Sequence, residues 1–375
     1  MRTSLGLVAV AVICVFFADF EIATGSPWRE MGRLLTGLVT PDLSNLGQVG
    51  EALLRTLAFG FTGVALGAAA GFLLALAFGH WLVRILCASV RAVHELFWAL
   101  IFLQFFGLNP LTGVLAIAIP FAGIFAKVYS EILDETNPTP ARVVPPGAGI
   151  LARFVYARVP EAWPHLVSYT SYRLECGLRS SAILGFVGMP TLGFYLESAF
   201  AQGDYSEVGA LLVTFYVLIA TLRLWARPKL IPVYVIAAPF LLGGGLPIVW
   251  GNVARFFTQD IVPAPLRGET ADWAGLGSWL WELLAHQALP GIANTIVLTQ
   301  IALVVTGVLT LLAYPLISRH FTGRVGGTFG HVVLVIARST PGNTCSPISS
   351  CNCGGHRCCR QSSHWRCTTA VSSPT

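Results

Sequence analysis

Charged residues are scarce in this sequence. Lys and Arg number 23 and Asp and Glu 18, so 11% of the 375 residues are charged while 55% are hydrophobic. Four long stretches, residues 56–79, 96–126, 230–254 and 283–318, contain no charged residue at all. A soluble chain of this length would need far more charge on its surface, whereas about 20 apolar residues suffice for a helix to cross a bilayer. The scarcity of charge therefore predicts an all-α, polytopic transmembrane helical bundle.

The motifs of several enzyme classes are also missing. No G-x4-G-K-[ST] loop is present, and the two lysines, Lys127 and Lys229, follow no such glycines. The segment HELFW at His94 departs from the H-E-x-x-H pattern of metalloproteases, and no G-x-S-x-G elbow occurs. We therefore expect no enzyme, with no catalytic residue, cofactor or metal, which leaves roles in transport, as a channel or as a scaffold.

Apolar segments predict nine membrane spans. Their ranges are residues 5–23, 56–79, 88–106, 110–130, 176–199, 208–226, 230–250, 288–317 and a last span that begins near residue 328. The third and fourth spans are separated only by GLNP, residues 107–110, which predicts a tight turn. Gln104 and Asn109 beside this turn fit either contact with a substrate or, more commonly, the capping of helix ends.

The distribution of Lys and Arg predicts the orientation of the spans. Placing the N-terminus in the cytoplasm puts most basic residues in or beside cytoplasmic loops, as the positive-inside rule requires. These residues are Arg2, Arg84, Arg91, Lys127, Arg142, Arg153, Arg158, Arg173, Arg223, Arg227, Lys229, Arg319 and Arg324. The net charge of +5 thus reflects topology and does not indicate nucleic-acid binding. The first 24 residues fit a cleaved signal peptide as well, but we favour an uncleaved span because residues 230–250 look like its counterpart.

Residues 53–79 and 292–318 share a pattern that predicts an internal repeat. Each begins with a polar residue and Thr, continues as an apolar run, and is followed by a short basic loop and a span entered through an Arg. A repeat unit of six spans is even, so both copies have the same orientation. We therefore expect a first half, residues 1–228, and the start of a second half, residues 229–338. The alternative is that apolar segments are alike by composition alone.

Cysteine becomes frequent at the end of the chain. The first 344 residues hold three cysteines, and the last 31 hold six: Cys345, Cys351, Cys353, Cys358, Cys359 and Cys367. Together with His356 their spacing matches no paired C-x2-C zinc pattern. Hydrophobic periodicity ends at the same point, within the ninth span, so we interpret residues 339–375 as an out-of-frame or disordered tail without a function.

The longest predicted cytoplasmic loop, residues 131–173, carries a basic, turn-rich segment. The stretch RVVPPGAGILARFVYARVP places Arg142, Arg153 and Arg158 around a Pro-Pro-Gly-Ala-Gly turn and ends at Pro160. Glycine allows the tight turn, and proline ends or re-aims a helix. We expect a short helix, a turn and a second helix that project from the bilayer and fit a groove on a partner. The alternative is a surface connector whose arginines reflect only the positive-inside rule.

At these residues the sequence resembles the permease subunits of ABC importers, whose cytoplasmic coupling loop has the pattern E-A-A-x3-G-x9-I-x-L-P. Gly147, followed by Ala148, matches the glycine, Ala157 stands at the isoleucine, Val159 at the leucine and Pro160 at the proline. The E-A-A positions fall on Ala141, Arg142 and Val143, so that half of the pattern is degenerate. Three further segments resemble the phosphonate-type branch and cover, with the loop, most of residues 50–226: RAVHELFWALIFLQFFGLNPLTGVLAIAI, IFAKVYSEILDE and YRLECGLRSSAILGFVGMPTLG.

The resemblance implies a fold, a function and partners. It implies the permease fold of binding-protein-dependent importers in the bacterial inner membrane, with about six spans per half and two permeases fused in one chain, the second interrupted. Separate ATP-binding cassette ATPase subunits would contact the loop around Gly147, and a periplasmic or extracellular substrate-binding protein would deliver phosphonate or a related small oxyanion. A second permease half or a second copy would complete the pathway. The alternatives are a permease for another small solute, or a non-functional truncated protein or scaffold.

Two further groups of residues are candidates for the pathway or its gating. Glu175 and Arg179 stand four residues apart in the order that favours a helical ion pair, which fits either an interfacial anchor or contact with an anionic substrate. Gly185, Gly188 and Gly193 flank Pro190, so the chain can kink and helices can approach closely there. Packing alone explains these glycines equally well.

Overall fold

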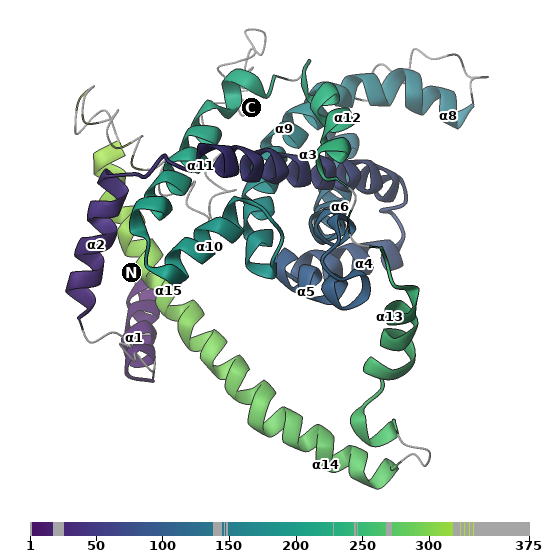
Figure 1. The fold of residues 1–375 in the computed structure, drawn as a ribbon. Helices are drawn as coiled ribbons and strands as arrows, with labels where there is room; N and C mark the ends of the chain where they lie inside the picture. The colour runs from purple at the N-terminus through teal and green to yellow at the C-terminus, as the bar shows by residue number, and fades with distance from the viewer. Residues whose placement is uncertain are drawn as a thin grey trace, which may run out of the picture. The chain divides into compact units, whose positions relative to one another are not determined.

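Helices account for all the regular secondary structure that the computed structural model describes, which comprises residues 2–17, 26–137, 145, 147, 149–227, 229–243, 245, 247–267 and 272–317 and four single residues beyond them. All of these belong to one unit, Met1–Ser339. Figure 1 labels the helices: α1 (Arg2–Phe17), α2 (Pro27–Val39), α3 (Leu46–Leu76), α4 (Trp81–Ala92), α5 (Glu95–Phe106), α6 (Pro110–Glu135), α8 (Ile150–Arg153), α9 (Val159–Ile183), α10 (Leu192–Gln202), α11 (Tyr205–Trp225), α12 (Ile231–Leu241), α13 (Trp250–Arg255), α14 (Trp273–Leu283) and α15 (Leu289–Ile317). The expectation of an all-α fold with apolar helices long enough to cross a membrane is confirmed.

The centre of the bundle is the contact between α3 and α6. Four glycines of α3, at intervals of three or four residues, form a stripe along its buried side: Gly60, Gly63, Gly67 and Gly71. A methyl group added to Gly63 would meet Ile117 of α6, and one added to Gly71 would meet the Phe125 side chain and the Ala122 carbonyl. Small residues let the backbones of membrane helices approach closely, so that van der Waals contact holds them together. Phe125 and Ile117, both fully buried, fill the space that this close approach leaves.

The predicted third span, residues 88–106, is two helices. α4 and α5 meet at 93°, because Val93 and His94 are extended and His94 begins a new helix. The imidazole Nδ1 of His94 accepts a hydrogen bond from the Leu96 amide at 3.2 Å, which satisfies one of the free amides at the start of α5. His94 therefore caps a helix at a sharp bend.

The predicted fifth span, residues 176–199, is also broken. α9 ends in a 3-10 turn, Leu184–Val187, and α10 starts after it with a bend of 49°. Gly188 ends the turn with φ +89°, a left-handed conformation that glycine adopts without strain. A methyl group on Gly185 would overlap Gly193 and Phe194, and one on Gly193 would overlap the Ala182 carbonyl, so these two glycines permit α9 and α10 to touch.

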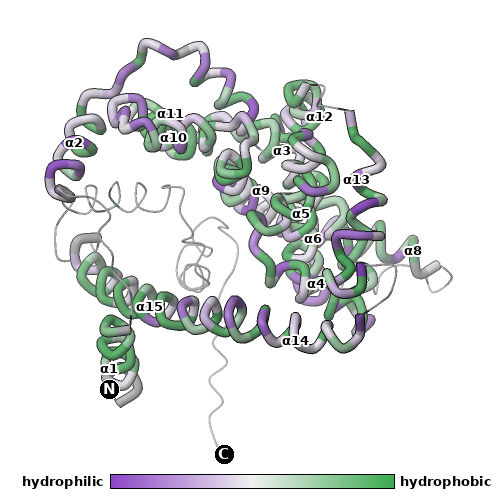
Figure 2. The backbone as a smooth tube through the Cα atoms, turned by 60° about the horizontal axis from the view of Figure 1, so that its bottom comes forward, coloured by the Kyte–Doolittle hydropathy of each residue, from purple (hydrophilic) through white to green (hydrophobic). Residues whose placement is uncertain are grey.

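The sequence predicts nine spans over the whole chain, part of which lies outside the described residues. Within the described ranges, four helices are long and apolar enough to cross a membrane, or six when each bent pair counts as one span. The first and seventh spans correspond to the shorter apolar helices α1 and α12, and the eighth is longer than expected because residues Trp273–Pro315 run continuously. Figure 2 shows that α1 and α15 are hydrophobic along most of their length. The ninth span and the tail, residues 339–375, lie largely or wholly outside the described residues.

Helix α2 packs against the start of α11 through glycine and one polar contact. Methyl groups on Gly37 and Gly209 would overlap the Tyr205 backbone and the Gly37 carbonyl, respectively, so the two helices are in direct contact. The Tyr205 hydroxyl donates to Glu30 Oε2 at 3.0 Å, and Arg33 Nη1 lies 3.1 Å from the same oxygen. The hydrogen bond from Tyr205, assisted by Arg33, holds the pKa of Glu30 below its usual value.

The glycine stripe predicts a position-dependent effect of larger side chains. Gly71→Leu should destabilise the bundle by about 1–3 kcal/mol or more, because the new side chain overlaps Phe125 and the α6 backbone. Gly50→Leu on the same helix is the matched control, since nothing lies within 4 Å of a methyl group there. Thermal unfolding of the purified chain in detergent measures the difference. Equal melting temperatures for the two variants would contradict the packing role of the stripe.

The lowered pKa of Glu30 predicts that acid loosens α2. A carboxyl group whose pKa falls on folding stabilises the folded contact above its unfolded pKa of about 4.5 and loses this contribution as the pH falls through the folded value. A nitroxide attached at Leu35→Cys on the exposed side of α2 should therefore gain mobility below about pH 4.5. Glu30→Gln should remove the pH dependence, and an unchanged pH profile in that variant would count against the contact.

Candidate functional site

The basic segment singled out in the sequence forms a helical arm. It begins at α8, continues through a π-helical turn, Phe154–Arg158, and runs without a break into α9. Gly147 lies in an exposed turn before it, while Ala148 and the E-A-A positions lie outside the described residues. In Figures 1 and 2 the α8 end of the arm extends away from the helices around α3 and α6.

The expected turn at Gly147 and a helix after it are present, and the first helix of the expectation lies outside the described residues, but the expectation that Pro160 ends the second helix is wrong. Pro160 stands directly after the π-helical turn, in the first turn of α9, and the helix continues past it to Ile183. The amide of Val159 reaches back to the carbonyl of Phe154, which closes the π turn and joins the two parts. Ala157 is buried, Val159 is half-buried and Pro160 is exposed, so the motif residues share no single face.

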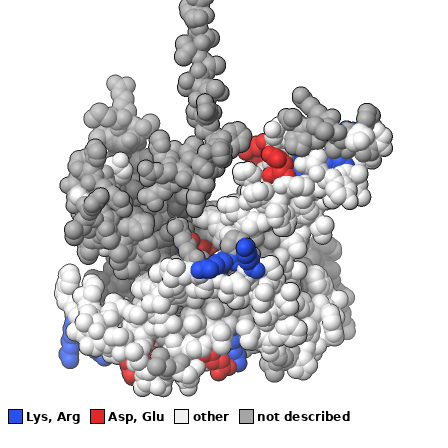
Figure 3. Space-filling model, turned by 90° about the horizontal axis from the view of Figure 1, so that it is seen from above, with Lys and Arg blue, Asp and Glu red and all other residues white. Residues whose placement is uncertain are grey.

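Arg158 fastens the arm to the end of α6. Its Nε donates to the Leu133 carbonyl at 2.9 Å, and its Nη2 donates to Asp134 Oδ1 at 2.9 Å. The first bond satisfies a carbonyl in the last turn of α6, and a cation is favourable at that end of a helix. In Figure 3 acidic and basic side chains form several small groups, at the upper right, at the centre and along the lower edge, and most of the described surface in that view is uncharged. The arm is therefore fixed at its base.

The exposed side of the arm is apolar and aromatic. Tyr156 is 81% exposed and Leu151 74%, and Val155 and Trp163 are exposed as well. Large exposed apolar side chains in one group mark surfaces that bind another molecule. The arm thus combines a fixed base with an uncovered apolar side.

Glu175 and Arg179 lie inside the bundle. Arg179 Nη2 donates to Glu175 Oε1 at 2.9 Å, and the side chain of Arg179 is 10% exposed. The next residue, Ser180, donates to Glu95 Oε1 at 2.7 Å across a sequence separation of 85 residues. The Ser180–Glu95 hydrogen bond thus joins α9 to the start of α5. The role of Glu175 and Arg179 in gating stays a prediction.

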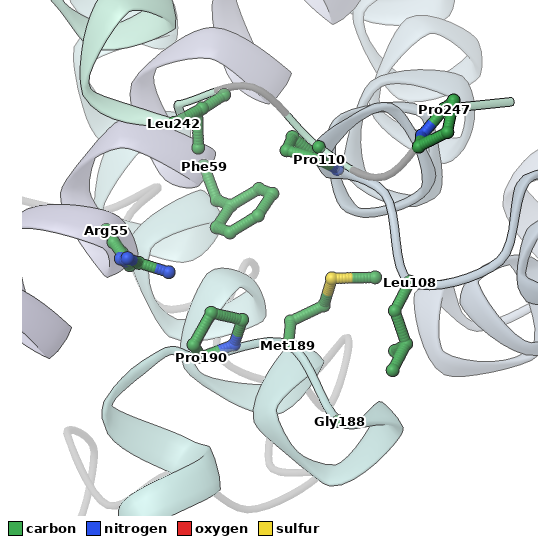
Figure 4. A pocket seen from close by; sticks show the side chains of 10 residues that line it. Arg55, Phe59, Leu108, Pro110, Gly188, Met189, Pro190, Leu242 and Pro247 are labelled. Carbon is green, nitrogen blue, oxygen red and sulfur yellow. The ribbon is translucent and has the colours of Figure 1, made fainter.

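One pocket of about 340 Å³ lies where α3, the turn before α6, the turn after α9 and the end of α12 meet (Figure 4). The residues that line it are Arg55, Phe59, Leu108, Pro110, Gly188, Met189, Pro190, Leu242, Gly245 and Pro247. Of the three glycines expected near the pathway, Gly188 lines this pocket, whereas Gly185 and Gly193 serve the contact of α9 with α10. The end of α12 contributes to the wall although it is remote in sequence.

Thr56 connects two walls of the pocket. Its hydroxyl donates to the Ala52 carbonyl at 2.7 Å and accepts a hydrogen bond from the Leu192 amide at 2.9 Å. Thr56 is fully buried, and Leu192 is the first residue of α10, whose amide has no partner within that helix. The turn that carries Gly188 and Met189 is therefore held against α3 next to Arg55.

Known proteins similar to this chain are transport permeases. The phosphate-import permease protein PhnE of Mycolicibacterium smegmatis is 31% identical over 212 residues, which are 53% of this chain and 40% of that protein. The phosphite transport system permease protein PtxC of Stutzerimonas stutzeri is 28% identical over 237 residues, 57% of this chain and 84% of that protein. The putative cryptic phosphonate transport system permease protein PhnE2 of Escherichia coli K12 is 31% identical over 110 residues, 90% of its length. The chain belongs to this family of phosphonate and phosphite ABC transport permeases.

The similarity covers only part of the length of the first two relatives. The permease chain spans about half or less of the length of the first two relatives, 40% of the Mycolicibacterium protein and 54% of the putative phosphite permease protein HtxE of Stutzerimonas stutzeri. No family model and no solved structure matches it. Relatives of this kind are transport subunits rather than enzymes, and the apolar helices fit a multi-pass inner-membrane protein. Over the described part of the permease, no group of three or more His, Cys, Asp and Glu side chains could hold a metal ion.

Sequence reasoning missed several residues of this permease. Arg55 and Met189 of the pocket, the Arg158 contact with α6 and the Ser180–Glu95 hydrogen bond all depend on contacts between distant segments. One signal was present in the sequence: Arg55 is the last charged residue before the uncharged run 56–79. A charge at that boundary points to a functional role or to an interface anchor.

The Thr56 bridge predicts a difference between two conservative substitutions. Thr56→Val should destabilise the permease by about 1–3 kcal/mol, because the buried amide of Leu192 loses its acceptor. Thr56→Ser keeps the hydroxyl and should stay close to the parent chain. Thermal unfolding in detergent compares the three proteins. A melting temperature of Thr56→Val equal to that of Thr56→Ser would contradict the bridge.

Proposed function

We propose that this chain is the membrane-spanning subunit of an ABC importer that forms the pathway for phosphonate, phosphite or a related small oxyanion. The observation that carries the proposal is the arm: an apolar, aromatic exposed side on a helix whose base Arg158 fastens to α6. In this family's plan the corresponding segment contacts ATPase subunits, and the names of the relatives support the substrate class. ATP hydrolysis belongs to those partners.

The connection of the arm to the bundle suggests how an ATPase would act on the pathway. The arm continues without a break into α9, which carries Arg179 and ends at the turn that lines the pocket. A rigid helix transmits a displacement from one end to the other. An interface that can pack in two alternative ways converts such a displacement into a switch between two states. Movement of the arm by a closing ATPase dimer would therefore tilt α9 and change the pocket wall at Gly188 and Met189.

The remaining partners follow from the same proposal. A substrate-binding protein on the outer side would deliver the ligand, and the cytoplasmic N-terminus expected from the distribution of basic residues puts the arm on the ATPase side. Residues 1–228 would form the first permease half and residues 229–338 the start of a second. A second half or a second copy of the chain would enclose the pathway. The support for this division is the repeated pattern in residues 53–79 and 292–318.

The exposed side of the arm gives a direct test. Tyr156→Ala should abolish co-purification with the ATP-binding cassette ATPase of a phosphonate system, because it removes the most exposed aromatic side chain of the arm. It should leave the fold intact, since the side chain is 81% exposed. Trp28→Ala is the matched control, as Trp28 is 82% exposed but lies on α2. The measurements are ATPase recovered with the tagged permease and uptake of radiolabelled methylphosphonate by cells.

Retention of the ATPase and of uptake in the Tyr156→Ala variant would refute the docking role of the arm. Absence of any bound ATPase and any uptake with the parent chain, folded and in the membrane, would refute the transport function and favour a non-functional protein or scaffold. Loss of both readouts in Trp28→Ala as well would show that the effect is not specific to the arm.

A further inference from the structure

The pocket beside α3 has a charged side chain at one end and is otherwise lined by apolar residues and glycines. Arg55 is the one charged side chain among the ten residues that line it, and the others are apolar side chains, glycines and prolines. In Figure 4 the Arg55 side chain extends from its helix toward the space between Phe59 and Pro190, while the Met189 side chain extends toward Leu108. A ligand in this pocket would therefore meet a cation at one end and an apolar wall at the other.

The hydrogen-bond donors of the pocket are concentrated on Arg55. Three of the lining residues, Pro110, Pro190 and Pro247, have no amide hydrogen. The amides of Gly188 and Met189 already donate to the carbonyls of Gly185 and Leu184, at 2.9 and 3.3 Å. Inorganic phosphate would place an oxygen against the side chains of Phe59, Leu108 and Met189, which donate no hydrogen bond, and this costs free energy.

The guanidinium of Arg55 has donors to spare. Among the described residues its acceptor is Glu51 Oε1, which binds Nη2 at 2.6 Å one helical turn away. A guanidinium carries five N–H donors in a fork that matches the oxygens of an oxyanion. The side chain of Glu51 is 63% exposed, so water can solvate its carboxylate when a ligand takes its place on Arg55.

The volume of the pocket is sufficient for the proposed ligand. A water molecule occupies about 30 Å³ in the liquid, so a pocket of about 340 Å³ has the volume of about eleven water molecules and holds a small tetrahedral anion with a short substituent and several waters. The apolar side chains of Phe59, Leu108 and Met189 suit a substituent bound through carbon.

We propose that this pocket binds a small organophosphonate, its anionic head on Arg55 and its alkyl substituent against Phe59, Leu108 and Met189. The inference rests on the proposed transport function and names the substrate class and the residue that selects it. Glu51 holds the guanidinium in the empty pocket and competes with the ligand for it. Preference for an alkylphosphonate over inorganic phosphate follows from the missing donors at the apolar end.

Thiol labelling in the full chain tests the proposal without the partners. Leu108 lines the pocket and is 50% exposed, so Leu108→Cys in nanodiscs should react with a maleimide at a rate read from the mass of the peptide that carries it. Ethylphosphonate should slow this reaction in a saturable manner. Leu35→Cys on α2, 57% exposed, is the matched control and should not respond.

Substitutions of Arg55 and Glu51 test which side chain binds the anionic head of the ligand. Arg55→Gln combined with Leu108→Cys should weaken protection by ethylphosphonate at least about tenfold, equivalent to about 1.4 kcal/mol. Arg55→Lys should weaken it less, because the charge stays and the fork is lost. Glu51→Gln should strengthen protection, since the competing carboxylate is gone. Inorganic phosphate should protect the parent chain about tenfold more weakly than ethylphosphonate.

Each result supports or overturns one part of the proposal. Equal protection in the parent and Arg55→Gln proteins, with matching melting temperatures, would overturn the role of Arg55. Equal protection by phosphate and ethylphosphonate would overturn the selection of an alkyl substituent. Uptake of methylphosphonate by cells without protection at Leu108→Cys would overturn the pocket and leave the transport function standing. Arg55-dependent protection in a chain that recruits no ATPase would support the pocket and refute the transport function.

Discussion

The close approach of α3 and α6 is the contact on which the rest of the described bundle depends. In a bilayer the lipid tails are as apolar as leucine, so burial of apolar surface between helices supplies little driving force, and direct packing must hold them together. The stripe Gly60, Gly63, Gly67 and Gly71 provides this by removing side chains where the backbones meet. Because α3 also carries Arg55 and Thr56, the same contact fixes the position of the pocket relative to α6.

Helix α9 links the two functional regions. At one end it is continuous with the arm that Arg158 ties to α6, and at the other it ends in the turn that Thr56 holds against α3. Between them, the Ser180 hydroxyl bonds to Glu95 at the start of α5, and Arg179 pairs with Glu175 inside the bundle. Buried polar contacts of this kind are costly unless satisfied, so they restrict α9 to a small number of arrangements. Under the proposed function, this restriction would let a displacement of the arm reach the pocket instead of being absorbed along the helix.

The parts of the fold that the sequence revealed are those governed by local pattern. Uncharged runs located α3 and α6, because the bilayer imposes a length of about 20 apolar residues that hydropathy alone reports. The GLNP turn is present, and Asn109 caps α6 by accepting from the Leu111 amide at 2.9 Å, the more common of its two expected roles. The family resemblance agreed with the relatives at 24–31% identity.

The features that the sequence did not reveal are those in which a single residue can take more than one structural role. Hydropathy treats residues 88–106 as one span, although His94 can satisfy free amides and so allows a 93° bend inside it. Pro160 was expected to end a helix, but a proline is equally suited to the first turn, and the hydrogen bonds of neighbouring residues decide between these positions. Arg55 gave only a boundary signal, because its partners in the pocket come from four separate segments.

The one-sided pocket shows how a membrane protein can select an anion with a single cation. A second cation would raise affinity for phosphate and phosphonate alike, and its burial without a partner would be expensive. Leaving the far wall without donors costs nothing when the ligand carries an alkyl group there, but it penalises an anion with a hydroxyl in that place. Discrimination then comes from groups the pocket lacks, and Glu51 keeps the lone arginine paired while the pocket is empty. Under this arrangement moderate affinity is an advantage, since a ligand held by one guanidinium can leave when α9 moves the opposite wall.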